Sequence, residues 1–144
     1  MKKEKRLQHA LHNEEVCKLL HDNKNFPDWV ITTAYYASMH FVSCYIFPMK
    51  EKTASGHTFD IKTLDDYCNY KGFAFGKHAT LCNLVRNKFP KIASEFRWLK
   101  DLCMAARYEN YQQTERDAQK AFELLTRVLF KRQGAKEKRI RTGQ

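Results

Sequence analysis

The stretch VITTAYYASMHFVSCYIF, residues 30–47, decides the fold. It contains no Asp, Glu, Lys or Arg, yet it holds two Thr, two Ser, three Tyr and one His. A membrane-spanning helix needs about 20 mostly apolar residues, and these hydroxyls and the imidazole would lack hydrogen-bond partners in lipid. We therefore expect no contact with a membrane and predict a buried central helix. Buried polar groups must be paired and often mark a site, so the polar side chains of this helix matter for function.

The composition around this stretch favours a single helical domain. A chain of 144 residues can bury a core of its own, and 43% apolar and 13% aromatic residues exclude a disordered chain. Only 5 Gly and 3 Pro are present, too few for the many turns of an all-β sandwich. The sequence therefore predicts an all-α protein, an up-and-down bundle of four to five helices.

Apolar residues at helical spacing predict where the helices lie. A first helix is expected over residues 3–21. The central helix is expected to have Asp28 as its N-cap, with Pro27 just outside it and Pro48 closing its far end. Residues 48–76 have too little periodicity to assign, apart from a short helical turn near 61–68.

The second half of the chain predicts three more helical segments. One is expected over residues 76–88, and Pro90 either ends it or opens the next. Apolar residues from position 92 to position 106 then form one helical face. Thr114, followed three residues later by Asp117, resembles a capping box and predicts the start of the last helix.

The net charge of +10 is concentrated at the two ends of the chain. Residues 131–144 hold six basic residues and one acidic residue, and residues 1–6 add a net +3, so the body is nearly neutral. Such charge attracts phosphate backbones without reading sequence. We expect one bundle domain over residues 1–130 and a basic flexible tail over residues 131–144.

The cysteines and the N-terminal residues indicate a cytoplasmic protein. Five cysteines stand singly with no CxxC pair, so neither a zinc site nor a disulfide framework is predicted. Residues 1–16 lack the apolar segment of a signal peptide. His9 and His12 lie three residues apart without a third ligand, so no metal and no cofactor are expected.

Two candidate ligand-binding histidines lie on different predicted helices. Tyr36, His40, Ser43 and Phe47 share one helical stripe, so their polar ends can meet. His40 is either a core histidine paired with a hydroxyl or carbonyl, or a site histidine facing a cleft or a symmetry mate.

His78, preceded by Lys77 near a predicted helix start, can bind an anion there or be a partly exposed helix-start residue. Arg107 ends an apolar helical face, and Tyr108 and Tyr111 follow it. An arginine beside two phenols can bind phosphate and stack a base, or it can pair with an acidic neighbour. No catalytic motif with a nucleophile, a phosphate loop or a metal appears, so whether the chain is an enzyme stays open.

Three segments together resemble the HEPN-type helical domains of prokaryotes, over roughly residues 5–130. They are PDWVITTAYYASMHFVSCYI, KHATLCNLVRNKF and FRWLKDLCMAARYENY. The resemblance is carried by Asp28, Trp29, Tyr35, Tyr36, His40, Tyr45, His78, Leu99, Arg107 and Tyr108. It implies a four- or five-helix up-and-down bundle that pairs as a homodimer. Many HEPN proteins are metal-independent ribonucleases of toxin–antitoxin and other defence systems, and others bind nucleotides or partner proteins such as small nucleotidyltransferases.

The ribonuclease motif that the resemblance implies is not intact. Active HEPN ribonucleases carry an Arg separated from a His by four to six residues, at the start of the last long helix. Counting from Arg107, the corresponding positions hold Gln112, Gln113 and Thr114. His40 or His78 would have to replace the missing general acid/base.

The interpretation that follows is a dimeric binding or regulatory component that interacts with RNA, a nucleotide or a partner protein in prokaryotic defence or toxin–antitoxin systems. One alternative is a metal-independent ribonuclease toxin with a diverged site, for which Arg107, His40 and His78 are the catalytic candidates. Another is a purely structural, partner-binding helical protein.

Overall fold

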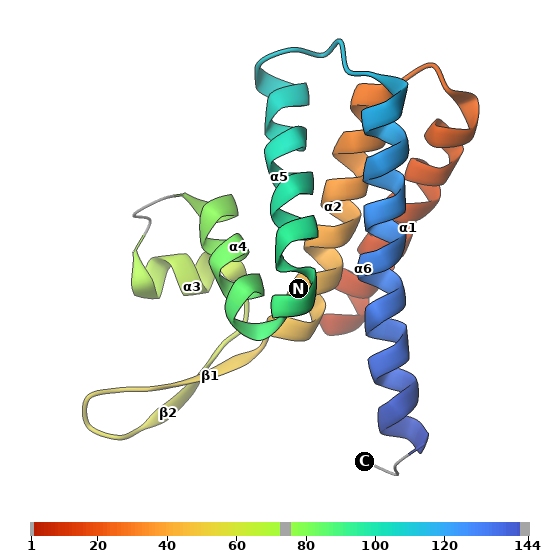
Figure 1. Cartoon of the computed structure of the whole chain (residues 1–144). Coiled ribbons are helices and arrows are strands. Elements are labelled where there is room, and N and C mark those ends of the chain that lie inside the picture. Colours follow the sequence, from red (N-terminus) through yellow and green to blue (C-terminus); the bar gives the residue numbers. More distant parts are fainter. Residues whose placement is uncertain (1, 73–75, 142–144) are drawn as a thin grey trace.

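The computed structural model describes residues 2–72 and 76–141, with side chains described up to residue 129 of the last helix. This part of the chain is predominantly helical and contains six α-helices, one short 3-10 helix and one β-hairpin (Figure 1). In chain order the elements are α1 (Lys3–Asn23), α2 (Pro27–Ile46), β1 (Met49–Lys52), β2 (Thr58–Ile61), α3 (Leu64–Lys71), α4 (Lys77–Lys88), η1 (Pro90–Ile92), α5 (Ala93–Tyr108) and α6 (Glu115–Arg141).

Helix α2 is the centre of the bundle. It packs against α1, α5 and α6, which run alongside it, while α3, α4 and the hairpin lie at one side of the molecule (Figure 1). Ala34, Tyr35 and Val42 are fully buried and Ile46 is 3% exposed, as predicted, whereas Met39, expected in the core or in a dimer interface, is only partly buried. A stripe of intermediate exposure remains on its outer face, formed by Tyr36, Met39, His40 and Ser43.

The start of α2 differs from the prediction. Asp28 is not the N-cap, because Pro27 is already the first residue of the helix and Phe26 precedes it. Proline suits this first position, since its missing N–H would have no partner there in any case. Asp28 lies in the first turn, where its backbone carbonyl accepts a hydrogen bond of 2.8 Å from Thr32 Oγ1.

Residues 48–76, left mostly unassigned by the sequence, contain an antiparallel hairpin and helix α3. Met49 pairs with Ile61 and Lys52 with Thr58 across the two strands. The expected helical turn is present as α3, three residues later than predicted, and Thr63 Oγ1 caps it by accepting from Asp66 N at 3.1 Å. The limit of five helices was therefore wrong, because the described residues form six α-helices.

The predicted starts of α4 and α6 are confirmed. Gly76 precedes α4 at a φ of 83°, a conformation that glycine adopts without strain. Thr114 Oγ1 accepts from Asp117 N at 3.1 Å at the start of α6. The backbone of residues 131–141 continues α6, whereas residues 142–144 of the expected tail lie outside the described residues. The mobility expected of this tail stays a prediction.

The core holds thiols and one buried cation besides its apolar side chains. The thiols of Cys17, Cys44, Cys68 and Cys103 are buried, and Cys82 is of intermediate exposure. Burial raises the pKa of Cys17 and of Cys103 to about 11. Among the described helices, none is both long enough and apolar enough to cross a membrane.

Arg6 joins α1 to the far end of α2 and to the hairpin. Its side chain is 7% exposed. Nη1 donates to the carbonyl of Phe47 at 3.4 Å, and Nη2 donates to the carbonyl of Lys62. Three segments that are distant in the sequence are thereby held together at one point.

Candidate functional site

Helices α2, α4 and α5 bring Tyr36, His78, Arg107 and Tyr108 together, and we call these four residues the arginine cluster. Arg107 Nη1 donates a hydrogen bond to the hydroxyl of Tyr36. The guanidinium carbon lies 5.5 Å from the ring centroid of Tyr36 and 5.0 Å from that of Tyr108. Stacking of this kind holds a guanidinium in place without neutralising its charge.

Arg107 is exposed and keeps an unneutralised charge. No ion pair joins it to a carboxylate in the described part of the chain. The sequence left open whether Arg107 pairs with an acidic neighbour, and the structure places it on two phenols instead. Its remaining donors are thus available to an anion from solvent.

His78 is held by a buried tyrosine. The hydroxyl of Tyr35 lies 2.7 Å from His78 Nδ1, and Tyr35 is fully buried. Among the described residues, this nitrogen is the one partner of that hydroxyl. A buried hydroxyl needs an acceptor for its proton, so Tyr35 donates and Nδ1 accepts. His78 then carries its own proton on Nε2.

Burial, together with the positive charges around it, keeps His78 neutral. Burial lowers its pKa first, and the positive charges of Lys77, Arg107 and Lys100 lower it further. Burial raises the pKa of Tyr36, although the nearby Arg107 acts in the opposite direction. At neutral pH the arginine cluster therefore presents one fixed cation together with neutral N–H and O–H groups.

The other predicted site residues lie elsewhere. His40 stacks on His9 of α1, with ring centroids 4.0 Å apart, so it belongs to the α1–α2 contact. Burial, and then His9, lower the pKa of His40 to about 4. Lys77 is paired with Asp65 at 2.7 Å.

Two more residues of the sequence analysis are also placed outside the arginine cluster. Tyr111 lies in the connection after α5 and is 70% exposed. Phe47 does not continue the stripe of Tyr36 and His40. It follows the end of α2 and is buried, being 2% exposed.

The arrangement also departs from the one that the HEPN resemblance implies. Arg107 lies in the last turn of α5, not at the start of the last long helix. Gln112 and Gln113 lie in the connection that leads to α6, where both bond to Asn110. A histidine at either position would therefore not share a helical face with Arg107.

A basic groove between α4, η1 and α5 was missed by the sequence analysis. It has a volume of about 560 Å³ and is lined by Ala79, Cys82, Asn83, Arg86, Pro90, Ala93, Ser94, Arg97 and Lys100. Three of these residues are cations and none is acidic. A signal was present in the sequence, because Arg97, Lys100 and Arg107 recur at spacings that place them on one helical face.

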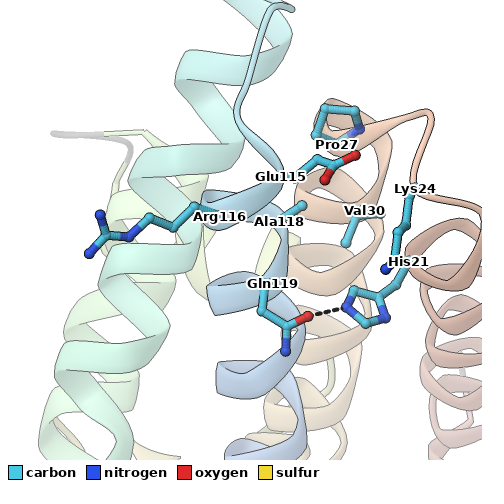
Figure 2. A pocket seen from close by; sticks show the side chains of 8 residues that line it. All are labelled: His21, Lys24, Pro27, Val30, Glu115, Arg116, Ala118 and Gln119. Carbon is cyan, nitrogen blue, oxygen red and sulfur yellow. Dashed lines mark hydrogen bonds between the residues drawn. The ribbon is translucent and has the colours of Figure 1, made fainter.

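A second cavity lies where the end of α1 meets the first turns of α2 and α6. It has a volume of about 220 Å³, and Figure 2 shows its lining side chains. His21 Nε2 bonds to Gln119 Oε1 inside it. Arg116 points away from the other lining side chains (Figure 2), whereas Glu115 adds a carboxylate to the same lining. This mixed lining makes the cavity a poorer anion site than the basic groove.

Comparisons of the chain with protein-family models, with curated proteins and with solved structures found no match. The HEPN relationship thus stays an expectation drawn from the sequence. The functional argument rests on the contacts, charges and exposure of the residues described above.

Proposed function

We propose that this protein is a binding component whose arginine cluster holds a phosphate group of an RNA or a nucleotide. The observation that carries the proposal is Arg107, an exposed guanidinium that is fixed over two aromatic rings and has no carboxylate partner in the described residues. An arginine held in this way loses little side-chain entropy when it binds phosphate.

Each member of the arginine cluster has a distinct role in this proposal. Arg107 supplies charge-assisted hydrogen bonds to phosphate oxygens. His78 donates through its Nε2–H. Tyr108, which is 70% exposed, offers its ring for stacking with a base. Tyr36 orients the guanidinium through its hydroxyl.

The same chemistry favours binding over RNA cleavage. A general base must present a free lone pair, and in His78 the Nδ1 lone pair already accepts from Tyr35. A general acid must be protonated, and the lowered pKa of His78 opposes that charge at neutral pH. His40 is stacked on His9 and does not supply the missing group.

Binding is tested by fluorescence anisotropy of a labelled single-stranded RNA at low and at physiological salt. Arg107→Gln should weaken binding about tenfold or more, because a hydrogen bond to a charged group contributes about 1.5–3 kcal/mol. The control is Arg127→Gln, which removes an exposed arginine of α6. Equal affinities for the Arg107 variant and the wild type would contradict the proposal.

Cleavage is tested on the same RNA without added metal. We expect no cutting by the wild type. If the RNA is cut, and if His78→Ala abolishes the cutting while the circular dichroism spectrum is unchanged, the ribonuclease alternative replaces the binding proposal.

A second candidate function, self-association or docking of a partner protein, is favoured by the outer stripe of α2. Tyr36, Met39, His40 and Ser43 stay partly exposed on a helix that has no charged residue after its first turn. A partly exposed surface without charge is typical of an interface core. A homodimer, a nucleotidyltransferase-like partner and a role in prokaryotic defence remain proposals from the HEPN resemblance.

A further inference from the structure

We infer that the ligand is a single-stranded polynucleotide whose backbone continues from the arginine cluster along α5 into the basic groove between α4, η1 and α5. This inference rests on the proposed function and adds the length and the path of the ligand. It predicts that a chain of nucleotides binds much more tightly than one nucleotide.

Three cations are spaced along one face of α5. Arg97, Lys100 and Arg107 lie at positions i, i+3 and i+10, which fall on the same face of an α-helix. With a rise of 1.5 Å per residue, the first and last of them are about 15 Å apart along the helix axis. One phosphate cannot reach both ends of such a row, whereas a strand of several nucleotides can.

The basic groove is lined by cations from both α4 and α5. Arg86 of α4 faces Arg97 and Lys100 of α5 across a volume of about 560 Å³. The arginines are exposed, while the side chain of Lys100 is only 20% exposed. Asn83 and Ser94 add uncharged hydrogen-bonding groups to the lining. Cations combined with neutral donors are suited to a phosphodiester backbone.

Lys100 links the groove to the arginine cluster. Lys100 lines the groove, and its positive charge adds to burial, the larger cause, in lowering the pKa of His78. On α4, His78 and Cys82 lie four residues apart, so they share one face of that helix. Cys82 lines the groove and His78 belongs to the arginine cluster, so the two sites are neighbours. A bound strand would meet a continuous series of cations.

One carboxylate, that of Asp101, lies beside the groove and pairs with two of its cations. Asp101 lies 2.6 Å from Lys100 Nζ and 3.9 Å from Arg97 Nε. It is 57% exposed, and exposed ion pairs contribute little stability, so a phosphate can compete for both cations. Arg86 has no ion pair within the described part of the chain.

The positive charge of the body is concentrated in residues 76–108. Residues 76–108 hold seven Lys or Arg and two Asp or Glu, a net charge of +5. The rest of the body, residues 7–75 and 109–130, holds nine basic and twelve acidic residues, a net charge of −3. The nearly neutral body thus contains one basic face, and a polyanion is steered toward it.

A comparable groove along α6 has a mixed charge and serves as an internal control. Its volume is about 590 Å³, and Arg116, Lys120 and Arg127 alternate there with Asp117 and Glu123. Removing two arginines from this surface changes the net charge by the same amount as removing Arg86 and Arg97. The two double variants therefore separate a specific path from a general loss of charge.

The probes are AMP and 5′-labelled oligoadenylates of three and nine nucleotides, with the nine-nucleotide DNA and the RNA duplex as further arms. We expect the nine-nucleotide RNA to bind at least tenfold more tightly than AMP, and the duplex to bind more weakly than the single strand. Arg86→Gln/Arg97→Gln should weaken the nine-nucleotide RNA about tenfold and leave AMP unchanged. For this double variant, the slope of log affinity against log salt concentration should decrease in magnitude by about 1.4, since each phosphate contact contributes about 0.7 for single strands.

Arg116→Gln/Arg127→Gln should leave the affinity for the nine-nucleotide RNA within about twofold of the wild type. The inference is overturned if AMP binds as tightly as the nine-nucleotide RNA, if both double variants weaken binding equally, or if the duplex binds as well as the single strand. In each of these cases Arg107→Gln should still weaken the binding of AMP, so failure of the path is distinguishable from failure of the arginine cluster. Equal affinity for the DNA strand would assign the path to single strands of both kinds and so support it.

Discussion

At the scale of single residues, the buried cation Arg6 connects α1 to the end of α2 and to the segment after β2. Its guanidinium donates to two backbone carbonyls and lies 6.0 Å from the ring centroid of Phe47. We expect Arg6→Met to lower the free energy of unfolding by about 2 kcal/mol, because two partly buried carbonyls lose a charged donor. Urea unfolding measures this. Lys5→Met is the control, and an equal midpoint for both variants would contradict the assigned role.

His40 gives the second prediction at this scale, a dependence of stability on pH. The pKa of His40 is lowered to about 4 in the folded protein, while an unfolded histidine titrates near 6.5. Between these values the unfolded chain binds more protons, so His40 favours folding above pH 6.5 and loses this contribution as the pH falls toward 4.

His40→Phe keeps a ring against His9 and removes this titration. We expect its urea midpoint to change less between pH 7 and pH 4.5 than that of the wild type. His57→Phe, in the exposed turn of the hairpin, should retain the wild-type pH dependence. A His40 variant with the full wild-type pH dependence would show that other groups are responsible.

At the scale of elements, the helices were predictable and the hairpin was not. The starts of α4 and α6 are indicated in the sequence by Gly76 and Thr114, respectively, and by the apolar helical faces that follow them. In β1 the half-buried positions hold Met49 and Glu51, so burial alternates without an alternation of apolar and polar residues. A two-stranded hairpin with such a pattern is stabilised by its contacts with the rest of the fold, which periodicity does not reveal.

The sequence indicated the individual residues of the candidate site but not which of them lie close together. The sequence singled out Tyr36, His78 and Arg107 separately, and the structure joins them because α4 and α5 both pack on α2. The sequence also suggested that His40 would join them, but in the structure His40 stacks on His9 of α1. Which neighbour a stripe meets is set by tertiary packing, so spacing along one helix does not decide it.

At the scale of the whole molecule, the outer stripe of α2 predicts the assembly state. We expect a dimer of twice the 17.1 kDa chain mass in light scattering at micromolar concentration. Met39→Glu places a charge in the stripe and should give a monomer. Leu19→Glu alters a 69% exposed apolar residue of α1 and should leave the dimer intact. A wild-type mass near 17 kDa would refute the prediction.

The reactivity of the buried thiols in the core reports how often the fold opens locally. A thiol reagent reaches Cys17, Cys44, Cys68 and Cys103 only when the surrounding helices separate, whereas Cys82 is partly accessible in the closed state. The rate at which each cysteine is alkylated therefore reports the local opening of its own helix contact. Without any introduced label, the alkylation rates of the native cysteines would show whether the hairpin side at Cys68 and the bundle at Cys17 open together or in sequence.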